Sequence, residues 1–187
     1  QDLMPIPKSE NVYRTIQNRI PQNVAEHSLR GDVEHVPSGP FITEWRIPVG
    51  FHVSLWTEDL ADMFPSVNVT DSHALTNAIG FVLDPEELKG TKAFQVLCKA
   101  CRRAGIAVPA QVVPCCKCSV QGNLNAPQWA TEAHRSLLKA YGGLAGVSEI
   151  RNRLPFPRGS SVEGLVYDDH FGMVAHPSAS WARSALG

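Results

Sequence analysis

Alternating apolar and polar positions near the middle of the chain predict a strand that ends in acidic residues. Phe51, Val53 and Leu55 are separated by single polar residues, which is the period of a half-buried strand. The same segment runs directly into Glu58 and Asp59. We therefore expect a carboxylate at the end of this strand.

A second pattern, close to the end of the sequence, predicts a β-hairpin with an acidic tip. The short segments 164–167 and 170–174 flank the pair Asp168 and Asp169. Two mostly apolar arms around a two-residue polar tip are typical of a hairpin. Because neighbouring carboxylates repel and tight turns favour Asn-Gly or Asp-Gly, the pair is either a solvated turn or a site for a divalent cation.

Two helices are predicted between these strands, at about 85–104 and 126–141. Asp84 is a suitable N-cap for the first, and Pro85 and Pro127 stand in the first turns, where the missing N–H of proline does no harm. Glycine follows each segment and is a typical stop signal.

The second predicted helix also carries hydrophobic residues at a regular spacing. Trp129, Ala133, Leu137 and Tyr141 repeat every four residues. The other segments show weaker patterns. Residues 106–120 are interpreted as extended, and residues 1–48, rich in proline, asparagine and polar residues, as loops and short elements.

Composition agrees with a globular domain and only mildly restricts the function. Hydrophobic residues make up 43% and charged residues 19% of the 187 positions. No apolar run is long enough to span a bilayer and no secretory signal pattern occurs, so we expect an intracellular protein that is neither secreted nor bound to a membrane. The net charge of −1 disfavours a nucleic-acid binder, but residues 101–187 hold nine Lys or Arg against five Asp or Glu, a local charge of +4.

Three short motifs occur in a fixed order along the chain. Residues 59–64 read Asp-Leu-Ala-Asp-Met-Phe, with an acid three residues and an aromatic ring five residues after the first Asp. Residues 120–127 contain Gln-Gly, followed five residues later by Pro at a helix start, and residues 166–169 read Val-Tyr-Asp-Asp. Together these motifs resemble the palm motifs of the reverse transcriptases of retroviruses and retrotransposons.

The resemblance implies a fold and a domain organisation. It implies an α+β polymerase palm, in which a small antiparallel sheet carries the acidic residues and is backed by the two helices. Residues 49–187 would form this palm-like domain, and residues 1–48 would be partial fingers or an N-terminal extension. The thumb is missing, and we expect it in a longer parent chain together with an RNase H domain.

The resemblance also implies a role for each motif residue. The catalytic residues would be Asp59, Asp168 and Asp169, holding Mg²⁺ or Mn²⁺ ions. The residues contacting the nucleotide would be Asp62, Phe64, Gln121 and Gly122.

The implied activity is that of an RNA-directed DNA polymerase, a nucleotidyltransferase. A primer 3′-hydroxyl would attack the α-phosphate of a deoxynucleoside triphosphate on an RNA or DNA template. Primer–template nucleic acid and deoxynucleoside triphosphates would be the partners. Since this chemistry needs no histidine, we expect His170 and His176 at the surface.

Two other interpretations remain open. The pairs Cys98-x-x-Cys101 and Cys115-x-x-Cys118 are separated by 13 residues, close to the spacing of a structural zinc site. Cys98 and Cys101 also fit the apolar stripe of a helix, where free cysteine behaves as a small buried hydrophobe. The second of these interpretations is an inactive palm-like scaffold that binds nucleic acid or a protein.

Overall fold

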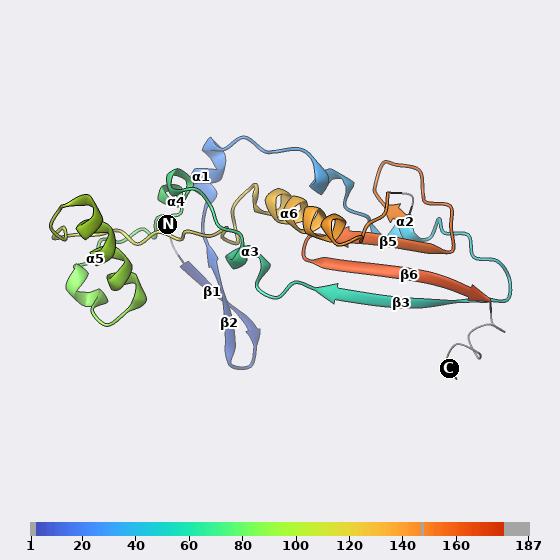
Figure 1. The fold of residues 1–187 in the computed structure, drawn as a ribbon, viewed down its shortest axis with the longest axis horizontal. Coiled ribbons are helices and arrows are strands. Elements are labelled where there is room, and N and C mark those ends of the chain that lie inside the picture. Colours follow the sequence, from blue (N-terminus) through green and yellow to red (C-terminus); the bar gives the residue numbers. More distant parts are fainter. Residues whose placement is uncertain (1–2, 147, 178–187) are drawn as a thin grey trace. The chain divides into compact units, whose positions relative to one another are not determined.

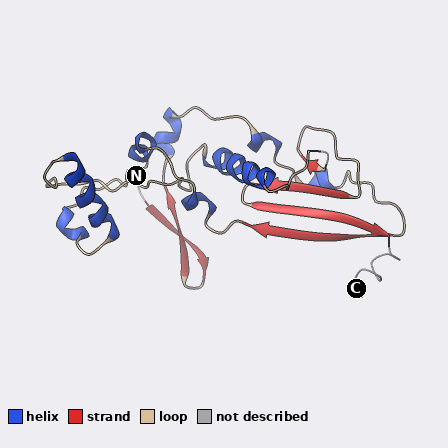
Figure 2. Cartoon of the chain, in the orientation of Figure 1, coloured by secondary structure: helices blue, strands red, loops and turns tan. Residues whose placement is uncertain are grey.

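The described part of the chain contains two compact units whose segments alternate along the sequence. The computed structural model describes residues 3–146 and 148–177. Unit 1 combines Gln1–Ala25 with Pro65–Asn123, and unit 2 combines Glu26–Phe64 with Leu124–Gly187. The described residues form two β-sheets and six α-helices, which confirms the predicted α+β class (Figures 1 and 2).

Unit 1 begins with an antiparallel hairpin that the sequence did not indicate. β1 (Leu3–Ser9) pairs with β2 (Val12–Gln17); both are short elements, as expected for residues 1–48, but their pairing was not predicted. Pro5 and Pro7 explain why, because proline normally demotes a strand and these two are accepted in a strand that has only one neighbour.

The predicted helix at 85–104 is two elements. A single 3₁₀ turn, η2 (Pro85–Leu88), begins at the predicted N-cap Asp84, which forms a capping box with Glu87. The chain then turns at Gly90, with φ of 85°, and Thr91 caps the longer helix α5 (Lys92–Ala104) by accepting a hydrogen bond from the Phe94 N–H. Gly105, at φ of 67°, ends α5 as predicted.

The remaining parts of unit 1 are short. The helices α1 (Ile20–Ala25) and α4 (Asp71–Thr76) each span six residues, and α3 (Met63–Ser66) lies where the chain passes from unit 2 to unit 1. Residues 106–120, predicted to be extended, contain neither a helix nor a named strand. Within the described residues this segment forms the isolated bridges Asn68–Cys118, Ala78–Cys115 and Leu83–Val112.

Unit 2 is organised around a four-stranded sheet in the order β3-β6-β5-β4. The strands are β3 (Phe51–Asp59), β4 (Glu149–Ile150), β5 (Ser161–Val166) and β6 (Asp169–Pro177). β6 is antiparallel to both β3 and β5, which confirms the predicted strand and hairpin, whereas the short β4 is parallel to β5.

The two faces of this sheet are covered by different layers. Since side chains alternate along a strand, Val162, Phe171 and Met173 share one face. That face packs against aromatic residues of the segment around α2 (Gly39–Ile42) and of the loop before β5, and we call it the α2 face. The opposite face carries His170 and contacts α6 (Ala126–Ala140), and we call it the α6 face.

Two glycines in the sheet make room for aromatic rings. A Cβ atom on Gly164 would lie less than 3.0 Å from the ring of Phe171, on the α2 face. A Cβ atom on Gly172 would lie equally close to the ring of Trp56, on the α6 face. Each ring therefore lies across the neighbouring strand and stiffens the ladder next to the hairpin.

The buried face of helix α6 is mainly polar. Its buried residues are Ala126, Gln128, Ala130, Thr131, His134 and Arg135. By contrast, the four-residue repeat seen in the sequence is mostly exposed, with 48% exposure at Leu137 and 86% at Tyr141.

A buried group of charges attaches α6 to its surroundings. Arg135 forms ion pairs with Glu149 of β4 and, at 2.9 Å, with Asp32 of the 3₁₀ turn η1 (Asp32–His35). Arg151 reaches the same Asp32 carboxylate at 3.0 Å. Burial lowers the pKa of the Arg135 guanidinium, and the Asp32 carboxylate opposes that effect. Three elements are thereby fixed around one carboxylate.

Within the described residues, none of the helices has the length and apolar character needed to cross a bilayer.

Candidate active site at the hairpin tip

The register of the sheet brings the first and third motifs together. Asp59, the last residue of β3, is paired directly with Asp169, the first residue of β6. The backbone N–H of Leu60 donates to the carbonyl of Asp168 at 3.1 Å, which ties the end of β3 to the hairpin tip. Three acidic residues from two distant segments therefore lie at one end of one ladder.

The hairpin turn adopts a strained conformation. β5 ends at Val166 and β6 begins at Asp169, so the turn consists of Tyr167 and Asp168, one residue earlier than the tip predicted from the sequence. Tyr167 has φ of 56°, as the first residue of such a turn requires. Glycine is usual there, and a side-chain-bearing residue in this region costs about 1–2 kcal/mol. Strain of this kind persists only where neighbouring contacts hold it.

The carboxylates act on one another electrostatically. The pKa of Asp169 is raised, first by partial desolvation of its mostly exposed carboxylate and then by the negative charges of Asp168 and Asp59, while His134 acts in the opposite direction. A divalent cation would relieve this repulsion, and carboxylate oxygens are the ligands that Mg²⁺ and Mn²⁺ prefer. Among the described residues, however, no three His, Cys, Asp or Glu side chains are arranged around a common point. The backbone brings the carboxylates together, and their side chains do not form a closed cage.

Two buried histidines behind the tip were missed by the sequence analysis. His170 is only 4% exposed, so the prediction of a surface residue was wrong. Its ring nitrogens lie 3.5 Å from Glu58 and 3.4 Å from Glu163, and its ring meets that of Trp56 edge-on at 4.7 Å. His176, by comparison, is half-buried.

The second histidine, His134 of α6, is also 4% exposed and contacts the hairpin turn itself. Its Nδ1 lies 3.1 Å from the carbonyl oxygen of Tyr167. The period of two along β6 could have identified His170, because this residue lies on the face opposite Asp169. No local signal marks His134, because its contact depends on how α6 packs against the sheet.

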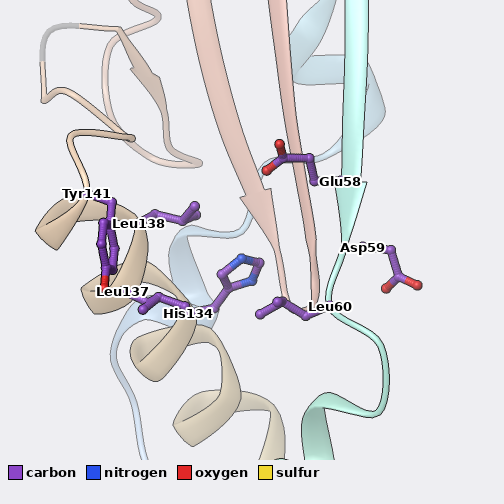
Figure 3. A pocket seen from close by; sticks show the side chains of 7 residues that line it. All are labelled: Glu58, Asp59, Leu60, His134, Leu137, Leu138 and Tyr141. Carbon is purple, nitrogen blue, oxygen red and sulfur yellow. The ribbon is translucent and has the colours of Figure 1, made fainter.

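A hollow of about 660 Å³ lies between α6 and the end of β3. Its lining consists of Glu58, Asp59, Leu60, His134, Leu137, Leu138 and Tyr141. Figure 3 shows the His134 ring directed toward the strands, and the Asp59 carboxylate on the other side of β3, pointing away from the hollow. The hollow is therefore on the α6 face, and the paired carboxylates Asp59 and Asp169 belong to the α2 face.

The predicted nucleotide-contacting residues are divided between the units. Asp62, exposed and with φ of 52°, and the half-buried Phe64 belong to unit 2. Gln121 and Gly122 belong to unit 1, where the Gln121 carbonyl accepts a hydrogen bond from the Gln17 N–H at 3.2 Å. Gly122, at φ of 104°, passes so close to the Gln17 carbonyl that a Cβ atom would collide with it. This close approach to β2 is a structural reason for glycine at position 122, and it does not involve a nucleotide.

The four cysteines of the predicted zinc site lie in two segments of unit 1. Cys98 and Cys101 are half-buried and buried on α5, and Cys115 and Cys118 are exposed and half-buried in the extended segment. Cys116, which is not part of the predicted set, has its pKa raised by burial and then by the neighbouring thiols of Cys118 and Cys115. No metal-binding group was found among the described residues, so zinc remains a prediction from spacing alone.

Neither a protein-family model nor a curated protein matches this chain.

Proposed function

We propose that this chain carries the palm of a reverse-transcriptase-like polymerase and that Asp59, Asp168 and Asp169 are its metal-binding carboxylates. The pairing of Asp59 with Asp169 is the observation that supports the proposal. A slip of one residue in the register would move Asp59 to the opposite face. Two motifs that are 110 residues apart (169 − 59) are thus paired at one end of the same ladder, which supports the proposal of a shared cation site.

The donor set at the tip is suited to Mg²⁺ or Mn²⁺, since it offers only hard oxygen ligands. A bound pair of such ions would lower the pKa of a primer 3′-hydroxyl and stabilise the departing pyrophosphate. The backbone of the chain determines where these carboxylates lie. β3 presents Asp59, the turn presents Asp168, and the hydrogen bond from Leu60 to Asp168 keeps the two strands in place.

The finer assignments follow from the same proposal. Residues 49–187 are the palm and residues 1–48 partial fingers, with residues 178–187 outside the described part of the chain. In unit 2, Asp62 and Phe64 are the residues proposed to contact the incoming deoxynucleoside triphosphate, and the assignment of Gln121 and Gly122 in unit 1 rests on the second motif alone. The partner is a primer annealed to an RNA or DNA template.

Binding of Mn²⁺, followed by electron paramagnetic resonance, tests the proposal first. We expect the wild-type chain to bind Mn²⁺, more tightly when a deoxynucleoside triphosphate adds its phosphates, and the Asp59→Asn variant to lose both effects. Glu132→Gln is the matched control, because it removes one negative charge from an exposed position of α6. If both variants bind Mn²⁺ as the wild type does, the acidic tip is a solvated turn and the proposal fails.

Primer extension then separates an enzyme from a scaffold. We expect a labelled primer on an RNA template to be extended in Mg²⁺ by the wild type and by Glu132→Gln, each joined to the thumb expected in the longer parent chain, but not by Asp168→Asn in the same form. A chain that binds the primer–template equally with and without Mg²⁺ and never extends it would be the inactive scaffold.

A further inference from the structure

We infer that His134 is a positioning residue for the acidic tip: it donates a hydrogen bond to the Tyr167 carbonyl and holds the turn that orients Asp168. The inference rests on the proposed function in so far as it assigns a purpose to Asp168. Its geometric part concerns only α6 and the hairpin and can be tested separately.

The first step of the argument is the direction of the hydrogen bond. The His134 Nδ1 lies 3.1 Å from the Tyr167 oxygen, and a carbonyl oxygen can only accept. Nδ1 must therefore carry the proton. Since His134 is only 4% exposed, water cannot readily replace this partner.

The second step is the need of the turn for support. Tyr167 occupies the left-handed region at φ of 56°, where a residue with a side chain is strained. Its carbonyl belongs to the peptide group that leads into Asp168, so a rotation of that peptide would swing the carboxylate. The hydrogen bond from His134 opposes this rotation directly. The Leu60 N–H holds the following peptide group through the Asp168 carbonyl, so Asp168 is fixed on both sides.

The third step is what fixes His134 itself. Its ring faces that of His170 nearly at right angles, with 6.4 Å between the ring centroids, and His170 itself lies between the carboxylates of Glu58 and Glu163. The next residue along α6, Arg135, is anchored in the buried ion pairs with Asp32 and Glu149. The imidazole is thus supported by its surroundings, as a group that orients a ligand must be.

Substitutions that keep or remove the donor test the inference. His134→Asn places an amide N–H close to the former position of Nδ1, whereas His134→Leu removes the donor and keeps comparable bulk. Leu137→Ala, on the same helix and in the lining of the same hollow, is the control for lost packing. The measurements are the ¹³C shift of the Tyr167 carbonyl, the amide shift of Asp168 and the affinity for Mn²⁺.

We expect the Leu variant to move both shifts and to bind Mn²⁺ about 10-fold more weakly, as loss of a partner behind a metal ligand does. The Asn variant should restore both shifts and the affinity, and Leu137→Ala should leave them at the wild-type values. If His134→Leu does not fold, His134→Gln replaces it, because its longer side chain cannot bring a donor to the position of Nδ1.

The outcomes separate the two proposals. If the wild type shows no Mn²⁺ binding that depends on Asp59, the proposed function fails. The shifts then decide the positioning role alone. Shifts that move in the Leu variant and return in the Asn variant support it. Shifts that stay unchanged in the Leu variant overturn the positioning role. Where the wild type does bind Mn²⁺, an unchanged affinity in the Leu variant also overturns it.

Discussion

The substitution Asp59→Asn should change the stability of the chain in opposite directions with and without a divalent cation. Without metal, it removes one of two like charges that face each other across the β3–β6 ladder. Such a pair destabilises a sheet by roughly 0.2–1 kcal/mol, and the exposure of both side chains favours the lower end. For a chain of this size, about 1 kcal/mol corresponds to about 2–4 °C in Tm, so we expect the variant to melt slightly higher.

Saturating Mg²⁺ should reverse this order. A ligand present at about 100 times its Kd stabilises the folded state by about 2.7 kcal/mol, or about 5–10 °C here. The wild type should gain that increment, and the variant, with one ligand fewer, should gain little. Thermal unfolding followed by circular dichroism at matched ionic strength measures the four Tm values, those of the wild type and of the variant with and without Mg²⁺. Glu132→Gln controls for the change in net charge.

Two results would refute the reasoning. If Asp59→Asn lowers Tm in the absence of metal, the paired carboxylates do not repel, and Asp59 contributes contacts of another kind. If wild type and variant gain the same increment from Mg²⁺, the ion acts elsewhere on the chain. Either result would separate the geometry of the tip from the metal chemistry proposed for it.

Three further predictions concern other parts of unit 2. Because the folded-state pKa of Asp169 lies above the usual 3.8, its stabilising contribution is complete below that value and is lost as the pH rises through the folded-state pKa. Urea unfolding should therefore show Asp169→Asn gaining stability relative to the wild type as the pH rises from below 3.8 through the folded-state pKa of Asp169, and a constant difference would contradict this. Gly172→Ala forces a Cβ atom into the ring of Trp56 and should lower the free energy of unfolding by about 1–3 kcal/mol, with a loss of near-ultraviolet circular dichroism. Arg135→Met leaves the Glu149 carboxylate buried without its main partner and should cost about 3–5 kcal/mol in urea unfolding, whereas a cost below about 1 kcal/mol would show that the ion pairs are not needed.

The elements that the sequence predicted correctly are those defined by local rules. The alternation from Phe51 gave β3, the two apolar arms gave the hairpin of β5 and β6, and the proline and glycine signals gave α6. The β1–β2 hairpin was missed because its prolines remove the usual strand signal. Local rules work for turns, caps and periods because the relevant contacts lie within a few residues.

The parts of the site that depend on packing could not be predicted in this way. The motifs predicted that Asp59 and the Asp168-Asp169 pair would meet, and the register brings these residues to one end of the ladder. The burial of His170 depends on which face of the sheet α6 covers, and the contact of His134 with Tyr167 depends on the position of α6 along the strands. A period in the sequence shows which residues share a face but not what covers that face.

The ladder between β3 and β6 also has a consequence for folding kinetics. Its nine paired positions make it the longest ladder among the described residues, and it joins segments about 110 residues apart. Closing so long a loop costs chain entropy before the pairing compensates for it, whereas the β5–β6 hairpin forms from neighbouring residues. We therefore expect the hairpin to form early and β3 to join it late. An intermediate that lacks this last step would contain Asp168 and Asp169 but not Asp59 beside them, so the candidate site would be absent from a chain that already has most of its secondary structure.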